Sequence, residues 1–358
     1  MDAEKNTSNS TLSFIKNIYE KEYKKLLIFS FLLLFLAIGQ IAFQIITTGD
    51  FVEKGISLKG GMSMIVPTDK NVDKYALEAA ISEKMPEIDV TVRTLTQGGK
   101  VTGFIIESDL DISDTQKIDD IVNNVMISTG LDLKKNDYSI EGMGSSLGAS
   151  FFKEAFRSLY IAFMFMGLIV FLYFGKGMKN KIISGTLSLT AAVFILVGKS
   201  MVSDVIGYII GLILIIIYFK NSIPSIAVIL AAFSDIVITL AVINIIGMKL
   251  STAGVAAFLM LIGYSVDTDI LLSTKVLKRK HGSLMERIYM GMKTGLTMNF
   301  STLAAVIIAM FISDSEVIKQ IMTIISIGLL VDLISTWIQN AGLLRMFIDK
   351  RKKHEIRT

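Results

Sequence analysis

The sequence predicts an α-helical membrane protein that crosses the bilayer several times and carries one α+β domain outside it. Apolar runs long enough to cross a bilayer recur between Leu26 and Leu344. One polar stretch, residues 47–157, interrupts these runs and has the mixed composition of an ordinary soluble domain. Lysine and arginine gather beside the runs, as they do in the cytoplasmic loops of membrane proteins.

The apolar runs predict up to eight spans, because a membrane-spanning helix needs about 20 predominantly apolar residues. The segments that reach or approach this length are residues 26–46, 159–174, 182–197, 205–219, 223–246, 250–273, 296–312 and 318–344. Two interpretations of the pair 182–197 and 205–219 stay open, since Lys199 and Asp204 mark either the tip of a hairpin or a re-entrant loop. Six spans remain without this pair, and the orientation of the chain is unchanged.

Basic clusters predict the orientation. They occupy Lys16–Lys25, Lys176–Lys181, Lys275–Lys280 and Lys350–Arg357. Threading the spans from a cytoplasmic N-terminus places all four clusters inside, in agreement with the positive-inside rule. A nucleic-acid-binding surface is the weaker interpretation, since each cluster abuts an apolar run. We therefore expect a multi-pass protein of the cytoplasmic membrane with both termini in the cytoplasm.

The spans also predict how the chain is divided. The expected parts are a basic cytoplasmic N-terminus (1–25), a first span (26–46), an extracytoplasmic α+β domain (47–157), a bundle of seven further spans (158–347) and a basic cytoplasmic tail (348–358). The possible hairpin covers about residues 182–219 of this bundle.

Within the polar stretch, periodicity predicts six elements. Alternating apolar residues indicate strands at 62–66, 90–95, 101–107 and 138–140, and helical spacing indicates helices at 72–84 and 113–126. Gln97-Gly98-Gly99 is a turn signal between the second and third strands. The order β-α-β-β-α-β is the split β-α-β, ferredoxin-like arrangement.

Composition argues against several kinds of site. The chain contains no cysteine, which excludes disulfides, cysteine catalysis and thiolate metal sites. His281 and His354 both lie in basic polar segments, so we expect neither a histidine metal site nor a histidine general base. No catalytic residues, metal or other cofactor are expected.

Four carboxylates lie inside the apolar runs: Asp235, Asp267, Asp269 and Asp332. A charged side chain at a helix centre costs about 2.5–3.5 kcal/mol on insertion scales, so acids kept there are paired or used. Asp267 and Asp269 are two residues apart, about 200° around a helix, and cannot face the same way.

Asp235 and Asp332 are predicted nearer mid-span, in oppositely oriented helices. Neighbouring side chains that would donate hydrogen bonds to them include Ser234, Asn299, Ser301 and Ser335. A purely structural role and a role in ion movement both remain open for these acids.

Two further features have competing interpretations. Lys275 follows Thr268 by seven residues and shares its helix face, so it is either a counter-ion or a side chain that snorkels to the inner surface. Gly55, Gly60 and Gly61 lie where the chain leaves the first span. We expect them to form a tight turn that leads directly into a strand and supports the base of the outer domain.

Four motifs in order along the chain resemble one protein family. They are Gly55–Gly61, Gly144–Gly148, Ser234–Thr239 and the Gly-Tyr-Ser-Val-Asp-Thr-Asp run at Gly263–Asp269. This set resembles the SecF family of the SecD–SecF protein-export complex, within the resistance-nodulation-division (RND) superfamily. The resemblance covers nearly the whole chain.

The chain departs from the family pattern at two places. Many bacterial relatives read Gly-Tyr-Ser-x-Asn-Asp-Thr at the last motif, whereas here Asp267, Thr268 and Asp269 occupy the Asn, Asp and Thr positions. This form resembles archaeal members and leaves open which carboxylate has the family's role. The family usually has six spans, so residues 182–219 look like an inserted hairpin.

The resemblance implies a non-enzymatic function. It implies one half of an RND-type membrane core that pairs with a SecD-like subunit at the Sec translocon, where a proton or sodium gradient assists transport of unfolded polypeptides across the lipid bilayer. Under it, the ion-coupling candidates are Asp235, Asp267, Asp269, Asp332 and Lys275, with Tyr264, Thr268, Asn299 and Ser301 as supporting polar residues.

Three alternatives belong to other functional classes. RND exporters of small molecules or lipids carry two large outer domains in one long chain, and this chain has one. The Gly-x-Gly-Asp signature of intramembrane aspartyl proteases is absent from the sequence. In a passive scaffold for a SecD-like partner, the acids would only hold helices together.

Overall fold

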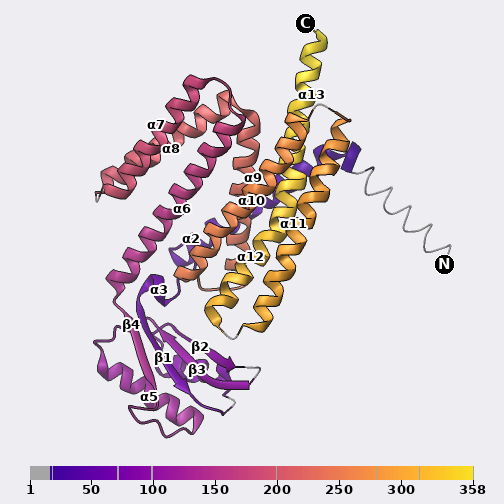
Figure 1. Cartoon of the computed structure of the whole chain (residues 1–358). Helices are drawn as coiled ribbons and strands as arrows, with labels where there is room; N and C mark the ends of the chain where they lie inside the picture. The colour runs from indigo at the N-terminus through magenta and orange to yellow at the C-terminus, as the bar shows by residue number, and fades with distance from the viewer. Residues whose placement is uncertain are drawn as a thin grey trace, which may run out of the picture.

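The computed structural model consists of a bundle of long helices with a small α+β domain at one end (Figure 1). It describes residues 17, 19–70, 72–97, 100–198, 200–279, 281–313 and 315–357. The long helices are α2 (Tyr23–Thr48), α6 (Ser145–Phe174), α7 (Met178–Val197), α8 (Met201–Asn221), α9 (Ile223–Ile245), α10 (Thr252–Lys278), α11 (Leu284–Ile312), α12 (Glu316–Ile334) and α13 (Ala341–Arg357), with a π-helical segment η1 (Ser335–Asn340) between the last two.

Within these residues, eight helical stretches are long and apolar enough to cross a membrane, as the sequence predicts. The last stretch, Val317–Lys350, runs through α12, η1 and α13. The pair α7 and α8 forms a hairpin of two helices of 20 and 21 residues, each about 30 Å long. This length favours the hairpin over the re-entrant loop, and its predicted tip residue Lys199 lies outside the described residues.

The hairpin packs beside α6 (Figure 1). Asp204, near the start of α8, accepts hydrogen bonds at 2.6 Å from the Arg157 guanidinium of α6. Lys153 lies 3.3 Å from the same carboxylate. This ion-pair cluster holds the hairpin to α6 at the end of the bundle that faces the α+β domain.

The outer domain contains β1 (Gly61–Pro67), α4 (Lys74–Lys84), β2 (Val90–Gln97), β3 (Lys100–Ser108), α5 (Thr115–Thr129) and β4 (Ser139–Met143). The predicted order of elements is therefore confirmed, while the turn predicted at Gly98-Gly99 lies outside the described residues. The strands follow the order β2-β3-β1-β4, and all three neighbouring pairs are antiparallel.

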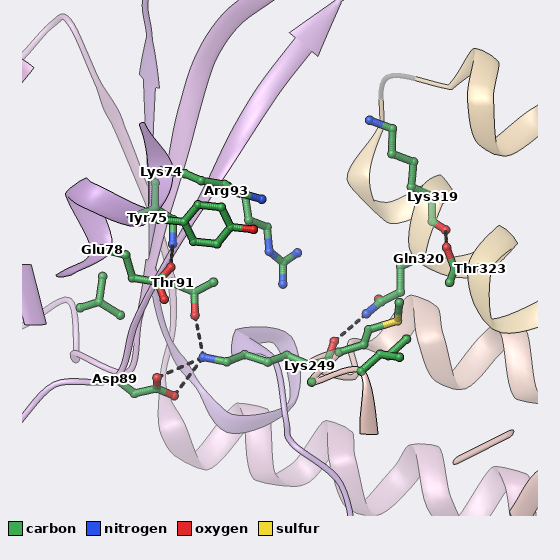
Figure 2. A pocket seen from close by; sticks show the side chains of 15 residues that line it. Lys74, Tyr75, Glu78, Asp89, Thr91, Arg93, Lys249, Lys319, Gln320 and Thr323 are labelled. Atoms are coloured by element: carbon green, nitrogen blue, oxygen red, sulfur yellow. Dashed lines mark hydrogen bonds and ion pairs between the residues drawn. The ribbon is translucent and has the colours of Figure 1, made fainter. Parts of the chain in front are cut away.

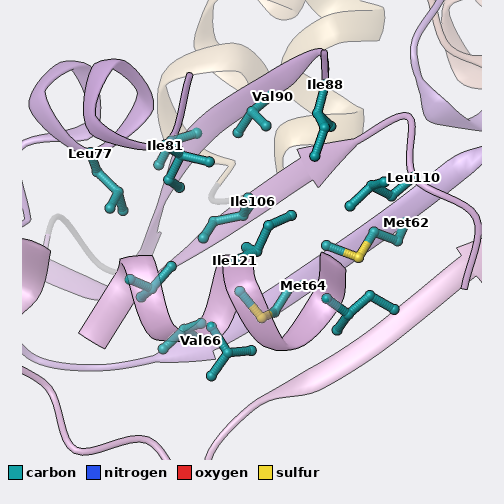
Figure 3. Packing of buried hydrophobic residues seen from close by; sticks show 14 of the residues in the cluster. Met62, Met64, Val66, Leu77, Ile81, Ile88, Val90, Ile106, Leu110 and Ile121 are labelled. Carbon is teal, nitrogen blue, oxygen red and sulfur yellow. The ribbon is translucent and has the colours of Figure 1, made fainter. Parts of the chain in front are cut away.

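One face of this sheet forms the core of the outer domain. Met62, Met64 and Ile106 point from β1 and β3 towards Ile81 of α4 and Ile121 of α5 (Figure 3). All five are fully buried, as the alternating pattern of the strands and the helical spacing require. Among the described residues no helix of the outer domain covers the other face of the sheet, which turns towards the ends of the membrane helices.

The glycine motif leads into a strand as predicted, because β1 begins at Gly61. The sequence did not predict the one helical turn, α3 (Ile56–Lys59), that lies within the motif between Gly55 and Gly60. Gly60 and Gly61 have φ of +88° and +137°, which side chains rarely adopt, and they turn the chain from α3 into β1. Four residues are too few for helical periodicity to reveal.

The second span also begins earlier than its apolar run. α6 starts at Ser145, so the last residues of the predicted outer segment 47–157 are helical and continuous with the span. These first turns pack against α3 at the base of the outer domain, which explains their polar composition.

Both described ends of the chain lie at the end of the bundle away from the outer domain (Figure 1). The Tyr19 hydroxyl donates to the Trp337 carbonyl at 2.8 Å, and Arg345 donates to the carbonyls of Tyr19 and Glu20 at 2.7 Å. Burial is the largest cause that raises the pKa of Tyr19. The two ends are thus tied together on one side of the bundle.

Candidate functional site

Three of the four intramembrane carboxylates meet at the centre of the bundle. Asp235 comes from α9, Asp269 from α10 and Asp332 from α12, and each is at most 1% exposed. A carboxylate buried at this depth needs hydrogen-bond donors or a cation. Among the described residues, hydroxyl and amide groups supply the donors, and no lysine or arginine forms a salt bridge with these three.

Asp235 is held by two serines. The hydroxyls of Ser265 on α10 and Ser335 in η1 both donate to its carboxylate. Ser335 was among the donors expected from the sequence, whereas Ser265 was missed, although it belongs to the Gly263–Asp269 motif. Ser234 was also expected to donate to a carboxylate. This expectation is wrong, because the Ser234 hydroxyl donates to the Leu230 carbonyl within its own helix.

Asp332 has donors on three helical segments. The Asn299 amide of α11 donates to it at 3.0 Å, the Thr268 hydroxyl of α10 lies 3.2 Å from each of its oxygens, and the Thr336 hydroxyl of η1 lies at 2.8 Å. The sequence predicted Asn299 here. Ser301, two residues further along α11, is exposed, so the expectation that it donates to a carboxylate is wrong.

Asp269 is bonded by two residues of η1. Its Oδ1 accepts from Thr336 at 3.0 Å and from the Asn340 amide at 2.8 Å. Neither partner was singled out from the sequence. The signal was their spacing, because Thr336 and Asn340 follow Asp332 by four and eight residues, a repeat that brings side chains close to one helix face.

The π-helical segment explains why one helix serves all three acids. Ser335, Thr336 and Asn340 all lie in η1, and each donates to a different carboxylate or pair of carboxylates. π-helical turns are rare and occur frequently at functional sites. Adjacent residues of a helix point in different directions, so Ser335 reaches Asp235 while Thr336 reaches Asp269 and Asp332.

Thr336 links two of the acids directly. Its hydroxyl lies within hydrogen-bond distance of both Asp269 and Asp332, yet a hydroxyl has a single proton to donate. Three further buried oxygens at the site have no partner among the described residues: Asp269 Oδ2, Asn299 Oδ1 and Asn340 Oδ1. The site therefore has spare acceptor capacity for a proton or a cation.

The remaining predicted site residues lie outside this network. Asp267 is exposed while Asp269 is buried, which confirms that they face different ways. Lys275 is half-buried, near Gly291 of α11, and forms no salt bridge with an acid among the described residues. Tyr264 is half-buried and packs with the apolar cluster around Phe258.

The glycine motif serves the joint between the outer domain and the bundle. The Gly55 N–H donates to the Leu250 carbonyl at 2.8 Å. A Cβ atom at Gly61 would collide with the Ser108 carbonyl oxygen of β3. These contacts agree with a tight turn at the base of the domain.

The chain resembles protein-export membrane proteins along most of its length. A family profile described as "Protein export membrane protein SecD/SecF, C-terminal" matches residues 196–350. The "Protein-export membrane protein SecF" of Pyrococcus furiosus is 31% identical over 342 residues, which cover 95% of this chain and 96% of that protein. The protein of the same name from Methanocaldococcus jannaschii is 29% identical over 94% of this chain and 99% of its own length.

A solved structure shares the fold. It is the crystal structure of SecDF, a translocon-associated membrane protein from Thermus thermophilus, with a TM-score of 0.55 and 15% identity over 91% of this chain. The present chain spans 38% of the length of that SecDF chain.

Proposed function

Because the chain belongs to the SecF family of protein-export membrane proteins, we propose that it assists Sec-dependent export by coupling an ion gradient to movement of its outer domain. The observation that carries this proposal is the buried network of Asp235, Asp269 and Asp332, which lacks a bonded lysine or arginine among the described residues. Buried acids of this kind in membrane helices mark ion pathways and proton relays.

The hydrogen bonds suggest how a proton would alter the site. The single proton of the Thr336 hydroxyl serves either Asp269 or Asp332 at one time. A proton added to one of these carboxyls makes it a donor, so that Thr336 can turn to the other. Arrival and release of a proton would thereby exchange hydrogen bonds between α10, α12 and η1. A sodium ion among the same oxygens would act similarly.

The available energy is adequate for a conformational bias. One elementary charge that crosses 100 mV yields about 2.3 kcal/mol. Since 1.4 kcal/mol is a tenfold change in an equilibrium constant, this corresponds to a bias of about fifty-fold between two positions of the outer domain.

The proposed partners are a SecD-like subunit, the Sec translocon and unfolded polypeptides in transit. The exposed carboxylate of Asp267 supports a partner in the membrane, because a charged group facing hydrocarbon is costly unless something covers it. We also propose that both chain ends lie in the cytoplasm. Support comes from the basic segments near 176–181 and 275–279, which lie at the end of the bundle opposite the outer domain.

The test is export complementation by four single variants, Asp235→Asn, Asp267→Asn, Asp269→Asn and Asp332→Asn, each checked for abundance and for association with the SecD-like subunit. We expect loss of gradient-stimulated export for the three buried positions, and near-normal export for Asp267→Asn. If all four export normally, the acids only hold helices together, and the chain is a scaffold for its partner. Hydrogen bonding of all three acids by serine, threonine or asparagine is the observation that would then explain their presence.

A further inference from the structure

The outer domain meets the bundle through two unlike contacts around the loop between α9 and α10. The first, which we name the packed joint, comprises Val52, Leu58 and Leu250 with the backbone of Gly55. The three apolar side chains are at most 1% exposed. Leu250 donates its N–H to the Glu53 carbonyl at 2.7 Å and accepts from Gly55 at 2.8 Å. This joint belongs to the same apolar cluster as the outer halves of α10 and α12.

The second contact is hollow. A cavity of about 630 Å³ separates the open sheet face and α4 from the ends of the membrane helices (Figure 2). Tyr75 and Thr91 line it on the domain side, and Met248, Gln320 and Thr323 line it on the bundle side. A neighbouring cavity of about 430 Å³ also lies between the sheet and the helix ends.

Lys249 crosses the first cavity (Figure 2). Its Nζ lies 3.1 Å from both oxygens of Asp89 and 2.7 Å from the Thr91 hydroxyl. Its own carbonyl is held at 2.6 Å by the Gln320 amide of α12. The side chains of Asp89 and Lys249 are 50% and 21% exposed, and partly exposed ion pairs stabilise a contact weakly compared with fully buried apolar side chains. The polar bridge is therefore the part of this boundary that opens most easily.

Glycines connect the domain to the packed joint on both sides. Gly60–Gly61 lead into β1 with positive φ, and Gly144 lies between β4 and α6. Lys59 makes two further bridges to the domain, 3.1 Å from Asp109 and 3.7 Å from Asp89, and these pairs are also partly exposed. Hinges are short segments at element ends that absorb changes in φ and ψ.

We propose that Lys249 is a releasable latch, and that the α+β domain swings on Gly60–Gly61 and Gly144 to open or close the cavity beneath its sheet. The packed joint stays closed during this movement. The latch residue follows α9 and precedes α10, which carry Asp235 and Asp269, and Gln320 ties it to α12, which carries Asp332. All three acid-bearing helices therefore converge on this residue. This inference rests on the proposed function.

The first test measures distances in the full chain in lipid nanodiscs and needs no export activity. The chain has no cysteine, so Tyr75→Cys with Thr323→Cys gives two unique spin-label sites across the cavity. We expect a narrow and a wide distance population. Lys249→Met keeps the side-chain stem and removes the charge, and should raise the ratio of wide to narrow by up to about fivefold. A single narrow population that Lys249→Met leaves unchanged would overturn the latch.

The second test locks the boundary during export. Tyr75→Cys with Thr323→Cys spans the cavity and keeps Lys249, and Ser57→Cys with Thr252→Cys spans the packed joint, where the Thr252 N–H lies 3.1 Å from the Ser57 hydroxyl. A bis-methanethiosulfonate reagent of matched length bridges either pair and is removed by reduction. Bridging across the cavity should abolish stimulation of export, with recovery on reduction, whereas bridging the joint should leave export unchanged.

Normal export with the cavity bridged would contradict the movement, and loss of export with the joint bridged would contradict its fixed position. Export by the double-cysteine variants before the reagent is added tests the proposed function independently of the movement. A chain that never stimulates export, yet shows two distance populations that respond to Lys249→Met, would refute the function and retain the latch.

Discussion

The core of the outer domain and the centre of the membrane bundle are built in opposite ways. In the outer domain, apolar side chains such as Met64 and Ile106 are buried and the charged ones face water. In the bundle, Asp235 and Asp332 are buried, while Phe35 and Ile46 are 71% and 83% exposed. One chain thus suits two surroundings, water around the outer domain and lipid around the bundle, and its buried carboxylates lie inside the bundle.

This difference in buried residues determines whether apolar or polar contacts stabilise each region. Full burial of an isoleucine side chain in a water-surrounded core contributes roughly 1.5–3 kcal/mol. In lipid the apolar surface gains little from burial against other apolar surface, so polar contacts specify which helices meet. A substitution in the outer core should therefore reduce stability strongly, and substitution of a polar residue in the bundle centre should change function at a smaller cost in stability.

The largest effect is expected in the outer core. Ile106→Ala removes a fully buried side chain beneath α4 and α5, and such substitutions cost about 2–5 kcal/mol. Limited proteolysis of the full chain in membranes should then cut the outer domain at lower denaturant concentration. The matched control, Ile127→Ala on the exposed surface of α5, should shift stability by less than about 0.5 kcal/mol. Equal protease resistance of the two variants would contradict this assignment of the core.

The second effect compares the buried and exposed acids of one helix. Asp269→Asn should remove gradient-stimulated export, with a loss approaching the bias of about fifty-fold that 100 mV supplies. Asp267→Asn, two residues away and exposed, should retain it. Export assayed with and without a protonophore, at matched abundance, gives both values. The reverse ranking would place the coupled carboxyl on the partner-facing side of α10.

The third effect isolates the shared hydroxyl. Thr336→Val deprives Asp269 and Asp332 of one donor while keeping the side-chain shape, and a single hydrogen bond contributes about 0.5–1.5 kcal/mol to stability. Thr336→Ser keeps the hydroxyl and serves as the control. The melting temperature of the purified chain should fall for valine alone. Identical melting and identical export for both variants would show that this hydroxyl does not link the acids.

The smallest effect concerns a surface turn of the outer domain. The backbone N–H and the hydroxyl of Ser113 donate to Asp111 at 3.0 and 2.8 Å and lower the pKa of its carboxyl. The stability from this turn is therefore present above the ordinary pKa of aspartate and is lost as pH falls through the lowered value. Ser113→Ala removes the hydroxyl but keeps the backbone N–H, which is the larger cause, so an NMR titration should show the pKa of Asp111 return part of the way to its ordinary value. An unchanged titration would mean that the hydroxyl does not contribute.

The sequence predicted those features of the structure best that depend only on a local pattern of residues. The apolar runs located all eight helices that are long and apolar enough to cross a membrane, and alternation located the four strands with the helices between them, because both depend on neighbours within one element. Polar first turns hid the start of α6 at Ser145, and a single turn was too short to reveal α3. Local composition therefore does not predict where a helix begins when its first turns pack against protein outside the apolar run.

By itself, therefore, the sequence determined the number of helices apolar enough to cross a membrane, the order of elements in the outer domain and the presence of carboxylates within those helices, each through hydrophobicity along a short stretch. Only the tertiary structure decided that Asp235, Asp269 and Asp332 meet while Asp267 does not, and that Thr336 and Asn340 serve them. These pairings join residues of α9, α10, α12 and η1, up to about 100 positions apart. These pairings depend on the angles at which the helices pack and on the π-helical turn, and neither can be predicted from the sequence of a single helix.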